Sequence, residues 1–204
     1  MKRFSDQLHE LEAVDWIIIC LAIIAYIPLA IAIIKDKEKG AGQNFCTWVL
    51  WVILDIVQFI CTVLAGGTYV MFFAFIPCAS IIMCLVFRYR KKMDDFEKII
   101  AVLVFLCIVI WLLFGEYWAI VFQTLSQIIA GLPLLRDTWR KAKEFRKTLL
   151  PLSIFAIVHL LCILRKDGWS VEHTLFPAAL EIFTLVSILP IILYLIKQKR
   201  KTHL

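Results

Sequence analysis

An acidic residue lies near the middle of a long apolar stretch of the chain. Residues 45–65 are mostly apolar, and Asp55 is close to their centre. An ionised carboxylate at the centre of a bilayer costs about 2.5–3.5 kcal/mol on insertion scales, so Asp55 is expected to face the protein interior or a wet cavity. Helical spacing places Trp48, Trp51 and Gln58 on the same face as this carboxylate. That face is a candidate lining for a small polar solute.

Further polar residues in apolar stretches could share this lining. Gln123 and Gln127 are one helical turn apart, and they either hydrogen-bond a solute or hold helices together in lipid, the commoner use. His159 could exchange protons with Asp55 or bond to a backbone carbonyl. Glu181 could pair with His159 or with a cationic solute, or it could reach towards the outer face. The predicted solute-binding residues are Trp51, Asp55, Gln58, Gln123, Gln127, His159 and Glu181.

The composition predicts a helical membrane protein. Hydrophobic residues make up 62% of the 204 residues, whereas soluble domains contain about 45–50% apolar residues. The apolar runs are long enough for transmembrane helices, and they lack the alternation of barrel strands. The 22 Lys and Arg residues lie mainly in short connections, where they orient helices and meet anionic lipid head groups. Nucleic-acid binding is therefore not expected.

Seven transmembrane spans are predicted, in an arrangement of three, one and three. Residues 1–98 form the first three-helix unit, with spans at 14–34, 45–65 and 68–87. Residues 99–114 form a linker helix. Residues 115–204 form the second unit, with spans at 117–135, 148–164 and 174–196 and a basic tail. The first dozen residues are predicted to form a short interfacial helix.

The distribution of positive charge predicts an orientation. Most of the 22 Lys and Arg residues lie in alternate connections and in the C-terminal tail. By the positive-inside rule, the N-terminus is expected outside and the C-terminus in the cytoplasm. The expected location is a bacterial inner (plasma) membrane.

The two three-helix units resemble each other in sequence. Residues 26–29 (Tyr-Ile-Pro-Leu) match residues 131–134 (Gly-Leu-Pro-Leu), and an offset of 104 residues relates Asp55 to His159. Because one linker helix separates them, both units acquire the same orientation, which is a parallel repeat. Pro28 and Pro133 are predicted hinges, since proline removes a helical hydrogen bond; a static kink is the alternative.

These features resemble the PQ-loop superfamily. The resemblance rests on Pro28 and Pro133 and on the Trp51 and Asp55 pair of the second span. The superfamily includes the SWEET sugar transporters, the lysosomal cystine and cationic amino-acid exporters and the bacterial nicotinamide riboside importers, and the KDEL receptor shares the fold. The resemblance implies an all-α membrane protein of seven transmembrane helices, with two parallel three-helix-bundle repeats joined by a linker helix. Leucine replaces the glutamine that names the motif at both sites.

The expected function is alternating-access transport of a small polar solute through a midplane site between the two bundles. Proton coupling through Asp55, which the resemblance to proton-coupled members implies, is a further hypothesis. The alternative is a non-transporting membrane receptor or scaffold with the same fold. No catalytic triad, phosphate-binding loop or metal-binding pattern is present in the sequence, so neither an enzyme nor a cofactor is predicted. The expected partners are the solute and the lipid bilayer, and a homo-oligomer is left open.

Overall fold

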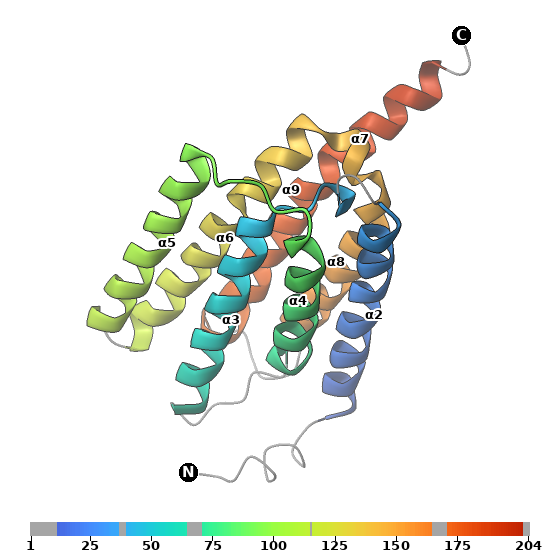
Figure 1. The fold of residues 1–204 in the computed structure, drawn as a ribbon. Coiled ribbons are helices and arrows are strands. Elements are labelled where there is room, and N and C mark those ends of the chain that lie inside the picture. Colours follow the sequence, from blue (N-terminus) through green and yellow to red (C-terminus); the bar gives the residue numbers. More distant parts are fainter. Residues whose placement is uncertain (1–11, 37–39, 65–70, 115, 165–170, 202–204) are drawn as a thin grey trace.

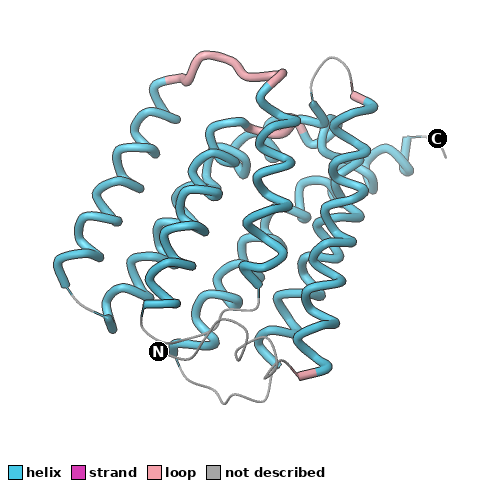
Figure 2. The backbone as a smooth tube through the Cα atoms, turned by 60° about the horizontal axis from the view of Figure 1, so that its bottom comes forward, coloured by secondary structure: helices cyan, strands magenta, loops and turns pink. Residues whose placement is uncertain are grey.

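The computed structural model describes residues 12–36, 40–64, 71–114, 116–164 and 171–201, and every regular element in these ranges is a helix (Figures 1 and 2). Short helical turns occur at η1 (Gly40–Gly42), α7 (Ala142–Phe145) and η2 (Arg146–Thr148). The long helices are α2 (Ala13–Lys35), α3 (Phe45–Leu64), α4 (Met71–Phe87), α5 (Asp95–Phe114), α6 (Glu116–Arg140), α8 (Leu149–Leu164) and α9 (Val171–Lys201). The all-helical prediction is therefore confirmed for the described chain.

The helices have the length and the surface of membrane-spanning segments. Four stretches of the described residues are long and apolar enough to cross a membrane: Ala13–Lys35, Asp95–Leu113, Ala142–Leu164 and Leu175–Arg200. On α2, Ile17, Ile24 and Ile31 are 51%, 48% and 45% exposed and recur every seven residues along one face. An apolar face of this extent is unfavourable in water and favourable in lipid. The protein is a polytopic helical membrane protein.

Six of the long helices form a closed ring. Each neighbouring pair in the order α3, α4, α2, α8, α9, α6 is in contact, and α6 packs back against α3. Helix α5 lies outside this ring and packs mainly against α6 (Figure 1). The ring encloses the buried polar residues described below.

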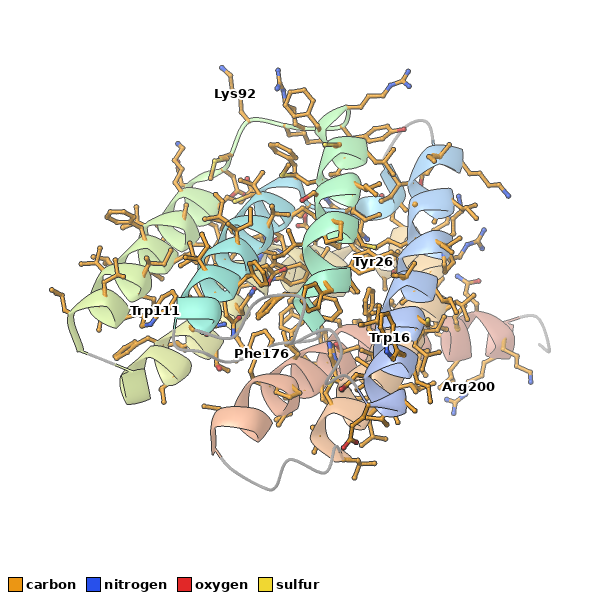
Figure 3. The ribbon with its side chains drawn as sticks, turned by 90° about the horizontal axis from the view of Figure 1, so that it is seen from below. Trp16, Tyr26, Lys92, Trp111, Phe176 and Arg200 are labelled. Atoms are coloured by element: carbon orange, nitrogen blue, oxygen red, sulfur yellow. The ribbon has the colours of Figure 1, made fainter. Side chains whose placement is uncertain are left out.

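One end of the bundle carries the basic connections. In Figure 1 the η1 turn, the loop from α4 to α5 and the segment around α7 all lie at the upper end, together with the C-terminal end of α9. Seen from below in Figure 3, Lys92 and Arg200 project from the periphery, whereas Tyr26 and Phe176 lie among the helices.

Several helices extend beyond the predicted apolar spans. Helix α5 begins at Asp95 and not at residue 99, because Asp94 and Glu97 form a reciprocal capping box: each side chain accepts a hydrogen bond from the other's backbone N–H, at 2.8 and 3.0 Å. Helices α6 and α9 continue to Arg140 and Lys201. The residues at these helix ends are polar and lie beyond the apolar stretch. Hydropathy alone therefore does not predict that the helix continues through them. The predicted interfacial helix falls largely within residues 1–11, outside the described residues.

Candidate functional site

A cavity of about 110 Å³ lies inside the ring of helices. A single water needs about 10–15 Å³ on this measure, so the cavity has room for several waters or a small solute. It reaches the basic end of the bundle, where Gln43, Thr138 and Thr148 contribute to its wall. Along α3 and α6 it ends at Asp55 and Gln127. The cavity thus extends from the basic end to the middle of the α3 helix.

Asp55 and Gln127 join α3 to α6 at the inner limit of the cavity. The Gln127 amide Nε2 donates a hydrogen bond of 2.6 Å to Asp55 Oδ1, and the Trp51 indole Nε1 donates one of 3.0 Å to the Gln127 carbonyl oxygen. Asp55 and Gln127 are 5% and 4% exposed. These bonds hold two helices together, which is the commoner use of a glutamine in lipid. The same side chains also line the cavity.

His159 lies on the α8 side of the same cavity. Its Nδ1 is 3.8 Å from Glu181 Oε2 and 3.5 Å from Thr184 Oγ1. The Thr184 hydroxyl donates to the Leu180 carbonyl at 2.8 Å, so its contact with His159 favours the tautomer that carries hydrogen on Nδ1. His159 also stacks on Phe155, with an interplanar angle of 18°. His159 and Glu181 are therefore neighbours, which corresponds to one of the alternatives that the sequence leaves open for Glu181.

The structure brings four of the seven predicted solute-binding residues to the cavity wall. Those four are Trp51, Asp55, Gln127 and His159; Gln58, Gln123 and Glu181 are not part of the wall. Gln58 and Gln123 lie one turn from Asp55 and Gln127, and both are buried. Gln58 Oε1, Gln123 Nε2 and Glu181 Oε2 are buried without a hydrogen-bond partner. The polar residues of α3 and α6 thus continue beyond the cavity into a closed region.

A glycine allows the aromatic wall to approach α6. A Cβ atom added at Gly131 would lie 2.5 Å from Phe183 Cζ and 3.1 Å from Trp51 Cζ2. The two rings pack edge to face, with centroids 5.9 Å apart. Two residues after the glycine is Pro133, and α6 continues through it, as α2 does through Pro28. The predicted hinge role of both prolines stays a prediction.

Aromatic side chains dominate the wall, and sequence reasoning identified few of them. Tyr26 and Phe155 pack edge to face at 4.9 Å, and Trp48 and Trp51 do so at 5.4 Å. Trp48 is 3% exposed and donates its N–H to Gln43 Oε1 at 3.1 Å, so it is not an anchor at the lipid interface. The aromatic residues of the wall are Tyr26, Trp48, Trp51, Phe75, Phe145, Phe155, Phe176 and Phe183. In an apolar span, the presence of a phenylalanine does not by itself show whether its ring faces lipid or a cavity.

A charged cluster at the basic end centres on Arg136 of α6. Its guanidinium is 2.8 Å from Asp94 Oδ2 and 3.5 Å from Asp137 Oδ1. Asn44 Nδ2 donates to Glu97 Oε1 at 2.7 Å, which joins the start of α3 to α5. The Glu97 backbone N–H, together with the Arg136 guanidinium, holds the pKa of the Asp94 carboxyl below its usual range. The cluster therefore connects the basic ends of α3, α5 and α6.

A polar hollow surrounds this cluster. Its volume is about 500 Å³, and Gln43 lines both this hollow and the central cavity. Gln43 therefore lies between the basic surface and the aromatic wall. In the described part of the chain, no group of three or more His, Cys, Asp or Glu side chains could hold a metal ion.

No family model, curated protein or solved structure matches the chain. The protein's class therefore follows from its own geometry. It is a polytopic helical membrane protein with an aromatic internal cavity and a buried carboxylate in the cavity wall.

Proposed function

We propose that the protein is an alternating-access transporter of a small polar solute, which binds in the central cavity. The observation that carries the proposal is Asp55, a carboxylate 5% exposed in the wall of a cavity within a membrane bundle. A buried acid of this kind is expensive to keep in a membrane and usually serves a solute or proton path. The proposal extends to the PQ-loop-like fold of two parallel triplets and a linker.

The helix contacts support the two-triplet arrangement. Exchanging α2, α3 and α4 for α6, α8 and α9 turns the α2–α4 contact into α6–α9, and α3–α4 into α8–α9. The same exchange turns α2–α8 into α6–α3, and all of these contacts are present. Helix α5 has no counterpart and lies outside the ring. This is the pattern expected of a repeat whose two copies face each other around a central site.

The position of the cavity supports an assignment of the conformation. We place the basic end of the bundle in the cytoplasm of a bacterial inner membrane, because positive connections are retained on that side. The cavity reaches this end through Thr138 and Thr148, so the structure corresponds to an inward-facing state in the proposal.

Unpartnered polar atoms mark where the opposite side would open. Gln58 Oε1 on α3 and Gln123 Nε2 on α6 are buried without a partner, one turn beyond Asp55 and Gln127. Each such atom costs about 1–3 kcal/mol relative to a satisfied one. Water that reaches them in an outward-facing state would remove this cost, which brings the two states closer in free energy.

Site-directed thiol labelling tests the proposal. In a cysteine-free background, Thr138→Cys and Gln58→Cys are each treated with a membrane-impermeant maleimide from either side of proteoliposomes. Alternating access predicts that Thr138→Cys reacts from the cytoplasmic side and Gln58→Cys from the outside, with solute shifting the ratio. The control Ile24→Cys lies on the lipid-facing surface of α2 and should react from neither side. A cavity that opens to the same side in every condition would instead indicate a receptor or scaffold.

Proton coupling through Asp55 is tested separately. Asp55→Asn retains a partner for the Gln127 amide but cannot carry a proton on and off a carboxyl group. Coupling predicts that uptake driven by a pH gradient is lost in this variant even at solute concentrations high enough to offset weaker binding. Unchanged pH-driven uptake in this variant would refute the coupling hypothesis.

A further inference from the structure

Asp55 has no positively charged partner among the described residues. It is 5% exposed, and the neutral Gln127 amide bonds to one of its carboxylate oxygens. No lysine or arginine is among the described residues that line the cavity. A buried ionised carboxylate is stabilised only when an opposite charge or several hydrogen-bond donors surround it. Within this cavity, the missing positive charge could come from the solute itself.

Most hydrogen-bond donors of the other polar groups in the cavity wall already donate to acceptors of the protein. Both indole N–H groups donate within the protein, Trp48 to Gln43 and Trp51 to the Gln127 carbonyl. Four hydroxyl groups of the wall donate to nearby backbone carbonyls at 2.7 or 2.8 Å: Thr138 to Leu134, Thr148 to Phe145, Thr184 to Leu180 and Ser187 to Phe183.

The groups that remain for a solute are mainly electron-rich. They are the Asp55 carboxylate, hydroxyl lone pairs and aromatic rings; the donors left are those of Tyr26, Gln43 and the second Gln127 amide hydrogen. A polyhydroxylated solute needs many donors as well as acceptors, whereas a cation needs acceptors and π faces. The aromatic rings pack edge to face on one another, at 79° for Trp51 and Phe183 and 82° for Tyr26 and Phe155.

We propose that the solute is a small organic cation of the substituted-ammonium class, whose charge is stabilised by Asp55 and by the surrounding aromatic rings. Aromatic rings attract ammonium groups through their quadrupoles, and alkylated ammonium ions need few hydrogen bonds. An inorganic cation fits less well, because it favours a shell of several oxygen ligands with more than one carboxylate, and Asp55 is the only carboxylate among the described residues that line the cavity. This inference rests on the binding site of the proposed function, and it names the chemical class of the solute.

Two ligands of the same shape, one charged and one neutral, show how much the positive charge contributes to binding. Choline and its uncharged carbon analogue, 3,3-dimethylbutan-1-ol, are compared by calorimetric titration of the purified full-length protein in detergent. We expect choline to bind and the alcohol to bind at least tenfold more weakly. Equal affinity for both ligands, or no detectable binding of either choline or tetramethylammonium, would overturn the inference. This comparison requires no variant and is independent of folding defects.

Two variants then locate the charge recognition. Asp55→Asn preserves a hydrogen-bonding partner for Gln127 and should weaken choline binding at least tenfold. Asp95→Asn removes the same charge from a side chain that is 93% exposed at the basic end of α5, and it should leave choline binding unchanged. Wild-type affinity in Asp55→Asn would place the cation elsewhere and refute the assignment.

Flux measurements distinguish the failure of this inference from the failure of the proposed function. Choline binding that depends on Asp55 without uptake into proteoliposomes supports the cation site and argues against transport. Conversely, uptake of an uncharged solute without choline binding refutes the cation inference and leaves the transporter proposal standing.

Discussion

Gly131 offers a quantitative test of the aromatic wall. In Gly131→Ala, the new Cβ would lie 2.5 Å from Phe183 Cζ and 2.6 Å from Phe183 Cε2. Carbon atoms in contact prefer about 3.5–4.0 Å, so the Phe183 ring must move by roughly 1 Å away from α6. Trp51, which packs edge to face on Phe183, restricts this movement. The substitution should therefore strain the wall beside Asp55.

Two opposing free-energy terms determine the effect on stability. Overpacking of this size costs about 1–3 kcal/mol, whereas replacing a helical glycine by alanine stabilises by about 1 kcal/mol. The expected net loss is about 0–2 kcal/mol. For a chain of this length, each kcal/mol corresponds to about 2–4 °C in Tm. We therefore expect Tm to fall by up to roughly 8 °C.

The assay uses cysteines that are already present. Cys46 and Cys107 are free and buried, so a thiol-reactive dye reports their exposure as the protein unfolds in detergent. The matched variant is Phe183→Leu, which lacks the two ring atoms closest to the new Cβ. A double-mutant cycle should give a favourable coupling of about 1–3 kcal/mol between Gly131→Ala and Phe183→Leu. A rise in Tm for Gly131→Ala, with no coupling to Phe183→Leu, would refute the close approach of α6 to the wall.

Three further predictions concern the basic end of the bundle. Arg136→Gln removes the common partner of Asp94 and Asp137, and we expect it to lower the free energy of unfolding by about 1–3 kcal/mol in the same dye assay. Lys98→Gln, which breaks an ion pair whose side chains are 63% and 93% exposed, should change it by less than about 0.5 kcal/mol; equal effects would contradict the cluster. The pKa of Asp94 is lowered in the folded protein. Its contribution to stability is therefore fully present above the pKa of the unfolded chain, about 3.9, and is lost as the pH falls through the pKa of the folded protein. Asp94→Asn should therefore flatten the loss of Tm below about pH 4, and an unchanged pH profile would exclude this role. Gly42 has a φ of +77°, and a Cβ there would meet Phe145 at 2.7 Å, so Gly42→Ala should lower the free energy of unfolding by about 1–2 kcal/mol or more; unchanged stability would argue against this turn geometry.

The sequence predicts the helical class well because lipid imposes a simple rule. Each long apolar run must satisfy its backbone hydrogen bonds internally, so these runs become helices. Polar residues whose exposure to lipid is costly can also be recognised in the sequence. Asp55, Gln127 and His159 occur in apolar stretches, and all three lie at the cavity wall. The cost of exposing these polar groups to lipid explains both why they are unusual in an apolar stretch and why they are buried inside the protein.

The remaining features depend on packing that residue types do not encode. Phe155 and Phe183 line the cavity, while Phe105 is 64% exposed on α5, yet all three occur in similar apolar runs. Glu181 lies near His159 but outside the wall, because the wall depends on rotation of α9 as well as on depth. Arg136 looks like an orientation signal in the sequence, although in the fold it connects acidic groups on two segments.

The placement of α5 has a consequence for how the chain could be divided. Helix α5 packs mainly against α6, and Arg136 of α6 contacts Asp94, the residue directly before α5. In the proposed two-unit arrangement, α5 would therefore belong with the second unit, and the boundary between the units would lie in the loop of residues 88–94. Two fragments separated within this loop, co-expressed as independent polypeptides, should reassemble in the membrane. A break between α5 and α6 would instead separate two helices that pack against each other, and reassembly should be poorer.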